Sequence, residues 1–270
     1  MITLKLCDDW ANGSLVAAPT SSLPAPIGGV RNWDYRYTWI RDAAYAVFAL
    51  RRVGIGEEAD AFLGWILDAF EQSRRPRIMY TLGGDPVPEE IHDADLEGYR
   101  RSAPVRWGNG AADQRQHDVY GEVLDCADQW LLPGRDLEPA LWSGLSELAE
   151  AAAHTWWQPD QGIWEVRSEG RVFTYSTGMC QVALDRAAAI GERLGLSGPI
   201  ATWRATAEKL RLAHPGPGVE RGHAVPGRAP RRWRRPGRQP AGAAAAQGHP
   251  GLPSPHDGHD RGHRRAPVGR

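Results

Sequence analysis

The chain has 270 residues, of which 32 are Lys or Arg, 33 are Asp or Glu, and 41% are hydrophobic. This length and apolar content suffice for one large domain or two small ones. No run of about 18 apolar residues occurs, which excludes a transmembrane helix, and no secretory signal is recognisable at the N-terminus. Three widely spaced cysteines without a CxxC pair argue against a disulfide framework and favour a cytoplasmic location.

The first 29 residues are expected to form a lead-in segment, and residues 30–214 to form the folded domain. The lead-in has weak alternation and a proline-rich turn at 21–26. Apolar residues then recur at helical spacing in six windows, namely 40–50, 59–70, 119–130, 137–148, 183–194 and 200–212. We therefore predict an all-α domain of about six helices, with short strands near the N-terminus and around 163–173. The segment 81–109 lacks periodicity and is predicted to be a long functional loop.

The last 56 residues, 215–270, differ from the rest in composition. They contain 10 Pro, 11 Gly and 11 Arg but three acidic residues, and Leu, Ile, Val and Phe together number four. Such a segment buries too little apolar surface to offset chain entropy, so we predict that it is disordered. Because 30 arginines against two lysines indicate GC-rich coding DNA, a frameshift is the favoured explanation of this tail. A solvated linker and a basic arm for nucleic acid are the alternatives.

An aromatic and charged cluster precedes the first predicted helix. Residues 32–42, NWDYRYTWIRD, contain four aromatic and four charged side chains. A pyranose has an apolar face that stacks on an indole, and its hydroxyls require paired donors and acceptors such as Arg and Asp. The cluster therefore fits a sugar pocket. The alternative is a buried Arg–Asp pair that holds the start of the helix.

Two further motifs carry candidate site residues. Glu165 directly follows Trp164 in the run GIWEVR, and an apolar niche beside a tryptophan raises the pKa of a carboxyl group, as a glycosidase general acid requires. An exposed turn is the alternative. In VRWGNG, Arg106, Trp107 and Asn109 precede a predicted helix whose first backbone N–H groups could face a ligand; a plain capped helix start is the alternative. No histidine or cysteine spacing fits a metal site, and no cofactor motif occurs.

These clusters, in this order, resemble glycoside hydrolase family 15, the glucoamylase and bacterial trehalase group. The segments that carry the resemblance are LVAAPTSSLP, GGVRNWDYRYTWIRD, LEGYRRSAPVRWGNGAAD, DVYGEVL and GIWEVR, all between residues 15 and 167. The resemblance implies an (α/α)6 toroid of paired helices and inverting acid–base hydrolysis, in which two carboxyl groups lie about 6.5–9.5 Å apart.

The resemblance also implies roles for individual residues. Glu165 matches the general acid, and Arg41 and Asp42 match the pair that grips the non-reducing glucose. Trp39, Trp107 and Trp164 match aromatic positions of that subsite, and Arg106 and Asn109 lie in the matching loop. The family's catalytic base lies later in the chain, and nothing in residues 215–270 resembles that region. We therefore expect a partial toroid with an uncovered apolar edge, whose hydrolytic activity is impaired.

Several interpretations of function remain open on the sequence. The resemblance implies release of glucose from an α-linked glucose oligosaccharide or from trehalose. A bacterial chain without a signal slightly favours cleavage of trehalose or of an intracellular oligosaccharide. The alternative within the same site is a non-catalytic α-glucoside-binding pseudoenzyme. A nucleic-acid binder that uses the basic tail is the third interpretation. For the folded domain we expect neither a nucleic-acid partner nor a membrane partner, and no cofactor.

Overall fold

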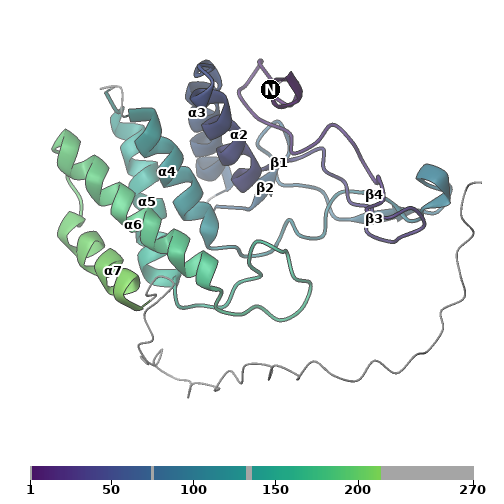
Figure 1. Cartoon of the computed structure of the whole chain (residues 1–270). Coiled ribbons are helices and arrows are strands. Elements are labelled where there is room, and N and C mark those ends of the chain that lie inside the picture. Colours follow the sequence, from purple (N-terminus) through teal and green to yellow (C-terminus); the bar gives the residue numbers. More distant parts are fainter. Residues whose placement is uncertain (1, 74–75, 132–135, 214–270) are drawn as a thin grey trace, which may run out of the picture. The chain divides into compact units, whose positions relative to one another are not determined.

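The computed structural model describes residues 2–73, 76–131 and 136–213 (Figure 1). The tail that the sequence analysis singled out, residues 215–270, lies outside the described residues. The chain divides into two units, 1–223 and 224–270, and every described residue belongs to the first. None of the described helices is long and apolar enough to cross a membrane.

The described residues are mostly helical, as predicted. The helices are α1 (Ile2–Lys5), α2 (Ile40–Arg52), α3 (Glu57–Ser73), α4 (Asp118–Leu131), α5 (Pro139–Thr155), α6 (Thr174–Leu194) and α7 (Ile200–Ala213), with a 3-10 turn η1 (Tyr99–Arg101). All six predicted windows coincide with α2 to α7. Helix α6 begins nine residues before its predicted window, because its first turns bury the small residues Ser176, Thr177 and Cys180 instead of large apolar ones.

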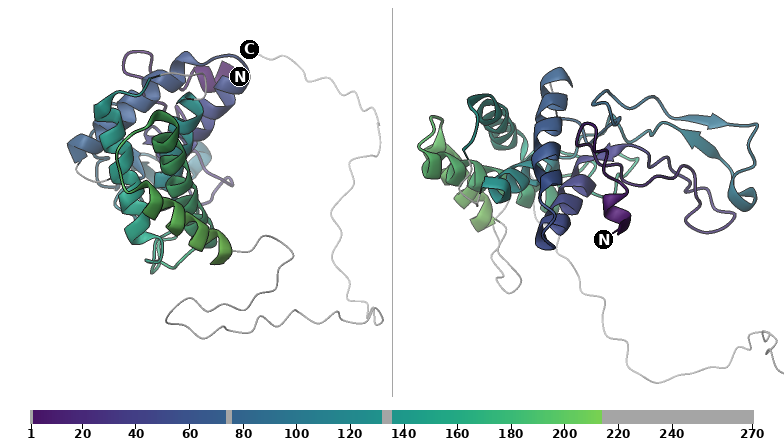
Figure 2. Two further views of the ribbon diagram at one scale, coloured as in Figure 1. Left: turned by 90° about the vertical axis from the view of Figure 1, so that its left-hand side faces the viewer. Right: turned by 90° about the horizontal axis from the view of Figure 1, so that it is seen from above.

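Helices α2 to α7 form three consecutive hairpins arranged in two rows. In one row α4 packs against α2 and α6, and in the other α5 contacts α3 and α7 (Figures 1 and 2). Helices α4 and α6 approach so closely that a Cβ on Gly121 would lie 2.3 Å from the carbonyl oxygen of Met179. Glycine is therefore required at this contact.

One hydrophobic core runs between the two rows of helices. Its largest fully buried side chains include Phe62 of α3, Leu124 of α4 and Trp203 of α7. The indole of Trp203 packs edge-on against Trp142 of α5, with ring centroids 6.0 Å apart, and donates to Glu150 Oε1 at 2.6 Å. This burial explains why the amphipathic spacing located the helices correctly.

Short strands are present, but not where they were predicted. Antiparallel pairs join β1 (Thr38–Trp39) to β2 (Met79–Tyr80), and β3 (Ile91–Asp93) to β4 (Val105–Trp107). The N-terminal region and the 163–173 region contain isolated bridges instead. Strands of two or three residues are too short to show a period of two, so the sequence pattern could not locate them.

The β3–β4 hairpin lies at the end of the unit far from α7, and the N-terminal segment runs beside it (Figures 1 and 2). Hydrogen bonds tie that segment to the rest of the unit. Asn12 donates to the carbonyl of Leu82 at 2.7 Å, and Asn32 donates to the carbonyl of Ser102 at 2.9 Å. The predicted loop 81–109 thus carries β3, η1 and β4 and contacts the N-terminal segment.

Candidate active site

The candidate site forms where the first turns of α2 and α4 meet the loop that precedes α6. Arg41 in the first turn of α2 pairs with Asp118, the first residue of α4, with Nε 3.2 Å from Oδ2. Helix N-termini carry partial positive charge and favour carboxylates such as Asp42 and Asp118. The fold therefore gathers charged side chains at this end of the helices.

A cavity of about 400 Å³ opens at this place. Its volume lies in the range of small-molecule sites. It combines aromatic faces with charged groups, the composition that a sugar requires. The lining residues are Ala17, Trp33, Tyr35, Trp39, Arg41, Asp42, Asn109, Ile163, Trp164, Glu165 and Arg167.

Glu165 occupies the turn that lines one side of the cavity. Its backbone φ is +51°, a left-handed conformation that non-glycine residues rarely adopt and that is concentrated at functional sites. The Trp39 indole N–H donates to Glu165 Oε1 at 2.6 Å. Burial raises the pKa of Glu165, and the Asp42 carboxylate adds to this, while the Trp39 bond and the charge of Arg41 act in the opposite direction. The net effect favours the protonated carboxyl that a general acid needs.

Arg41 and Asp42 face the same cavity from α2. Asp42 is exposed as a whole residue, but partial burial of its carboxylate raises its pKa, and the charge of Arg41 partly offsets this. Arg41 is held by Asp118 and by Gln116 Oε1, which accepts from Arg41 Nη1 at 3.2 Å. A fixed guanidinium next to a carboxylate offers paired donors and acceptors to vicinal hydroxyls.

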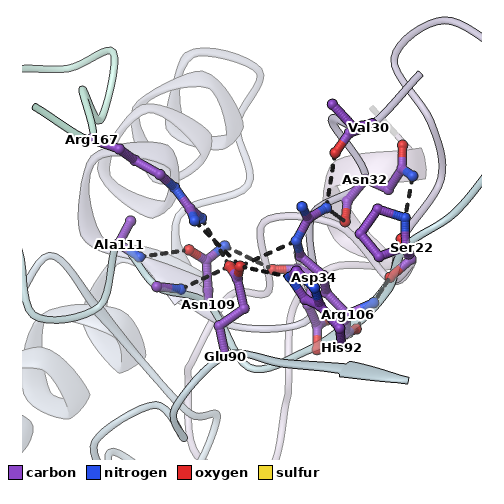
Figure 3. Close-up of polar contacts among 12 residues, drawn as sticks. Ser22, Val30, Asn32, Asp34, Glu90, His92, Arg106, Asn109, Ala111 and Arg167 are labelled. Carbon is purple, nitrogen blue, oxygen red and sulfur yellow. Dashed lines mark hydrogen bonds and ion pairs between the residues drawn. The ribbon is translucent and has the colours of Figure 1, made fainter. Parts of the chain in front are cut away.

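A second polar cluster supports the wall of the cavity (Figure 3). The Glu90 carboxylate accepts three hydrogen bonds. The donors are Arg167 Nη2 at 2.8 Å, Arg106 Nε at 3.1 Å and the backbone N–H of Gly110 at 3.0 Å. Burial acts to raise the pKa of Glu90, but the bond from Arg167 and the other two contacts outweigh it and lower the pKa to about 2. Both guanidinium carbons lie over the Trp33 ring, at 4.4 Å for Arg106 and 4.3 Å for Arg167. This ionised cluster orients the Trp33 indole at the cavity wall.

The structure brings six of the eight sequence-predicted site residues to the lining of one cavity. These are Trp39, Arg41, Asp42, Asn109, Trp164 and Glu165. The side-chain amide of Asn109 forms two hydrogen bonds with the backbone. Its oxygen accepts from the N–H of Ala111 at 2.9 Å, and its NH₂ group donates to the carbonyl of Asp34 at 3.3 Å. Trp164 is 82% exposed, so its face is open to a ligand.

The other two predicted residues, Arg106 and Trp107, do not line the cavity. Arg106 is buried and donates to the carbonyl oxygens of Val30 and Asn32 in addition to Glu90. Trp107 donates to Asp93 Oδ2 at 3.1 Å on the β3–β4 hairpin. Arg106 therefore supports Trp33 from outside the cavity, and Trp107 contributes to the hairpin beside it.

Three aromatic or charged lining residues were not predicted as site residues, although each lies in a motif named above. Trp33 and Tyr35 belong to NWDYRYTWIRD, and Arg167 ends GIWEVR. Alternation of aromatic and charged residues was the available signal for the first two. Glu90 and Asp118 carried no local signal, because their partners lie between 16 and 77 residues away in sequence. Among the described residues, no group of three or more His, Cys, Asp or Glu side chains could hold a metal ion.

The chain is similar in sequence to several trehalases. The chain is 43% identical to the trehalase of Mycolicibacterium smegmatis over 226 residues, which are 82% of this chain and 34% of that protein. It is also 43% identical to the trehalase of Mycobacterium tuberculosis, over 78% of this chain and 32% of that one. The trehalase of Thermoplasma acidophilum is 39% identical, over 77% and 36% of the two chains. The chain thus spans about a third of the length of these relatives.

The fold and the family are shown by two further matches. A solved glucoamylase from Saccharomycopsis fibuligera aligns with a TM-score of 0.50 and 17% identity, covering 74% of this chain and 42% of that one. This similarity confirms the predicted fold class, a partial (α/α)6 toroid. Residues 1–228 match the model of glycosyl hydrolases family 15. Together with the trehalase relatives, this match confirms the resemblance drawn from the motifs: the chain belongs to glycosyl hydrolase family 15.

Proposed function

We propose that this chain carries the general acid and the glucose-binding subsite of an α-glucoside hydrolase, with trehalose as the first candidate substrate. The observation that carries the proposal is the position of Glu165. Its carboxyl group, with a raised pKa, lines the same cavity as Arg41 and Asp42. The relatives named trehalase favour trehalose over a longer α-glucan.

In this proposal each group acts on a different part of the sugar. The apolar face of the non-reducing glucose stacks on the indoles of the cavity. Arg41 and Asp42 bind its hydroxyls as donor and acceptor. Glu165 donates its proton to the glycosidic oxygen as the bond to the anomeric carbon breaks, and the leaving sugar departs with that proton as its new hydroxyl hydrogen.

Complete hydrolysis by inversion also needs a base that activates water. Two carboxyl groups belong to the described lining of the cavity, Glu165 and Asp42, and Asp42 matches the glucose-gripping position. We therefore propose that this chain alone turns over slowly, because the described lining offers no further carboxyl group as base and general-base catalysis contributes about 10²–10⁴-fold.

The test is a glucose-release assay with trehalose and with maltotriose. We expect slow release that Glu165→Gln lowers further, whereas Glu169→Gln, which changes an exposed carboxylate in the same loop, leaves the rate unchanged. Release that is unaffected by Glu165→Gln would contradict the assignment of the acid. Rapid release by the unmodified chain would contradict the proposed impairment.

A second function rests on the same lining. With Trp39, Arg41 and Asp42 in place and no further carboxyl group in the described lining to act as base, the chain would bind an α-glucoside without cleaving it. Saturable quenching of tryptophan fluorescence by trehalose, combined with no detectable glucose release, would favour this non-catalytic function over slow hydrolysis.

A further inference from the structure

Two glutamines in the loop before α4 connect Arg41 with the backbone of Glu165. Gln116 Oε1 accepts from Nη1 and Nη2 of Arg41, and Gln116 Nε2 donates to Gln114 Oε1 at 3.1 Å. Gln114 Nε2 in turn donates to the backbone carbonyl oxygens of Glu165 at 3.2 Å and Val166 at 3.4 Å. A continuous chain of hydrogen bonds therefore runs from the α2 side of the cavity to the turn that carries Glu165.

Arg41 fixes the order of donors and acceptors along this series of hydrogen bonds. A guanidinium can only donate, so Gln116 must present its amide oxygen to Arg41 and its NH₂ group to Gln114. Gln114 must then present its own oxygen to Gln116 and its NH₂ group to the carbonyl oxygens of Glu165 and Val166. Reversing either amide would place two acceptors face to face.

The two ends of this series of hydrogen bonds differ in rigidity. At one end Arg41 is anchored by Asp118, which is 1% exposed, and Gln116 is itself buried. At the other end Glu165 has a φ of +51° within the turn that begins at Gly162. A left-handed glutamate persists only where surrounding contacts hold it. The contacts from Gln114 supply part of that support.

We propose that Gln116 and Gln114 are positioning residues that fix the Glu165 turn from Arg41, so that the sugar-binding group and the general acid keep one relative geometry. This inference rests on the proposed function for its meaning in catalysis. Its structural content, the dependence of the Glu165 turn on the two glutamines, is independent of any ligand.

The most selective test is Gln116→Glu. The introduced carboxylate still accepts from Arg41, but it offers no donor to Gln114. The Gln114 amide must then reverse, which turns its oxygen toward the carbonyl oxygens of Glu165 and Val166 and releases the turn. A second variant, Gln114→Met, removes the same donors and leaves Arg41 and Gln116 unchanged. The control is Gln72→Glu, which adds a charge at an exposed position of α3.

The first readout is the indole N–H resonance of Trp39, because this group bonds Glu165 directly. The resonance is assigned by its loss in Trp39→Phe. We expect it to shift in Gln116→Glu and Gln114→Met and to stay unchanged in Gln72→Glu. Hydrogen exchange of residues 160–168 should become about tenfold faster in the first two variants, as loss of one net hydrogen bond implies. An unchanged Trp39 resonance and unchanged exchange in both variants would overturn the proposal.

A second readout separates this inference from the proposed function. If both are right, the two variants lower kcat for glucose release while KM stays within about twofold, because Arg41 keeps its partner. If no α-glucoside binds the unmodified protein, the proposed function fails, yet the Trp39 shift and the faster exchange still support the positioning role. If α-glucosides bind and neither signal changes, the positioning role fails alone.

Discussion

At the scale of single residues, the surroundings of the Glu165 carboxyl group determine its pKa. Burial raises its pKa, the Trp39 indole and Arg41 lower it, and Asp42 raises it. The influences of Trp39, Arg41 and Asp42 belong to different side chains, so each of these three can be removed separately. The contribution of the surroundings to acid strength can therefore be measured.

Two substitutions should move the pKa of Glu165 in opposite directions. Trp39→Phe removes a donor to the ionised carboxylate, so the pKa should rise further. Asp42→Asn removes a neighbouring negative charge, so the pKa should fall. An NMR titration of ¹³C-labelled glutamate carboxyl groups, with Glu165 assigned by its loss in Glu165→Gln, measures both shifts. Two shifts of the same sign would show that this account of the site's electrostatics is wrong.

The backbone at Glu165 predicts a conflict between stability and function. Asparagine tolerates the left-handed region better than glutamine does, so Glu165→Asn should be more stable than Glu165→Gln by about 0.5–1 kcal/mol. Both variants should lack general-acid activity. Urea unfolding of the pair checks the difference, and equal stabilities would mean that the turn carries no backbone strain.

Most of this site was predictable from the sequence, for a physical reason. Aromatic and charged side chains that alternate next to one helix, as in Trp39 to Asp42, indicate the kind of site from residues that are neighbours in sequence. Glu90, Gln114 and Gln116 could not be identified this way. Their importance arises from contacts with Arg41, Arg167 and the Glu165 backbone, which lie far away in sequence and meet only in the folded chain.

At the scale of elements, the three hairpins depend on how their helices end. Helix α6 ends at Leu194 and is capped by Gly195, whose φ is +64° and where an added Cβ would meet no neighbouring atom within 4 Å. Gly195→Ala should therefore lower the free energy of unfolding by about 1 kcal/mol through backbone strain alone.

Gly178 provides the matched control within the same helix. It lies inside α6, again with no atom within 4 Å of an added Cβ, so Gly178→Ala should stabilise the protein by about 0.5–1 kcal/mol. Thermal unfolding of the two variants should move the melting temperature in opposite directions. A shift of the same sign in both would contradict the assigned end of α6.

A buried acid between helices predicts how stability depends on pH. Burial raises the pKa of Glu122 on α4 to about 7, against the hydrogen bond that Tyr175 donates from α6 at 2.8 Å. Because the folded pKa lies above the unfolded value of 4.5, the stabilising contribution is complete below about pH 4.5. It is lost as the pH rises through 7, by about 3 kcal/mol at most.

Glu122→Gln should remove this loss. The amide oxygen still accepts from Tyr175, but nothing ionises, so urea unfolding at pH 5.5 and pH 8 should show a smaller difference in the variant than in the unmodified protein. Asp136→Asn, at an exposed position, serves as the control. A pH difference that persists unchanged in Glu122→Gln would exclude Glu122 as its source.

The elements themselves were predictable where apolar side chains are large and regularly spaced. The windows in α3, α4 and α5 contain buried Leu, Ile, Phe or Val at helical intervals, and the structure forms helices there. The beginning of α6 and the strands β1 to β4 gave no such signal. Their positions are set by small buried residues and by pairing partners distant in sequence.

At the scale of the whole molecule, the described residues contain three helical hairpins of a family whose fold is a six-hairpin toroid. The chain spans about a third of the trehalases that it matches, and the site lies at the end where α2 and α4 begin. The proposed glucose-binding groups and the proposed acid therefore belong to this part of the fold. This arrangement leads to the central claim that the cavity recognises a terminal glucose by itself.

The most direct test of that claim is a calorimetric titration of the full chain with trehalose at neutral pH. We predict saturable binding at one site per chain. Asp42→Ala should weaken this binding at least about tenfold, as loss of one charge-assisted hydrogen bond implies. Glu165→Gln should retain it, because the acid acts on the leaving oxygen rather than on the hydroxyls held by Arg41 and Asp42. No saturable heat, or binding that Asp42→Ala leaves unchanged, would contradict the account.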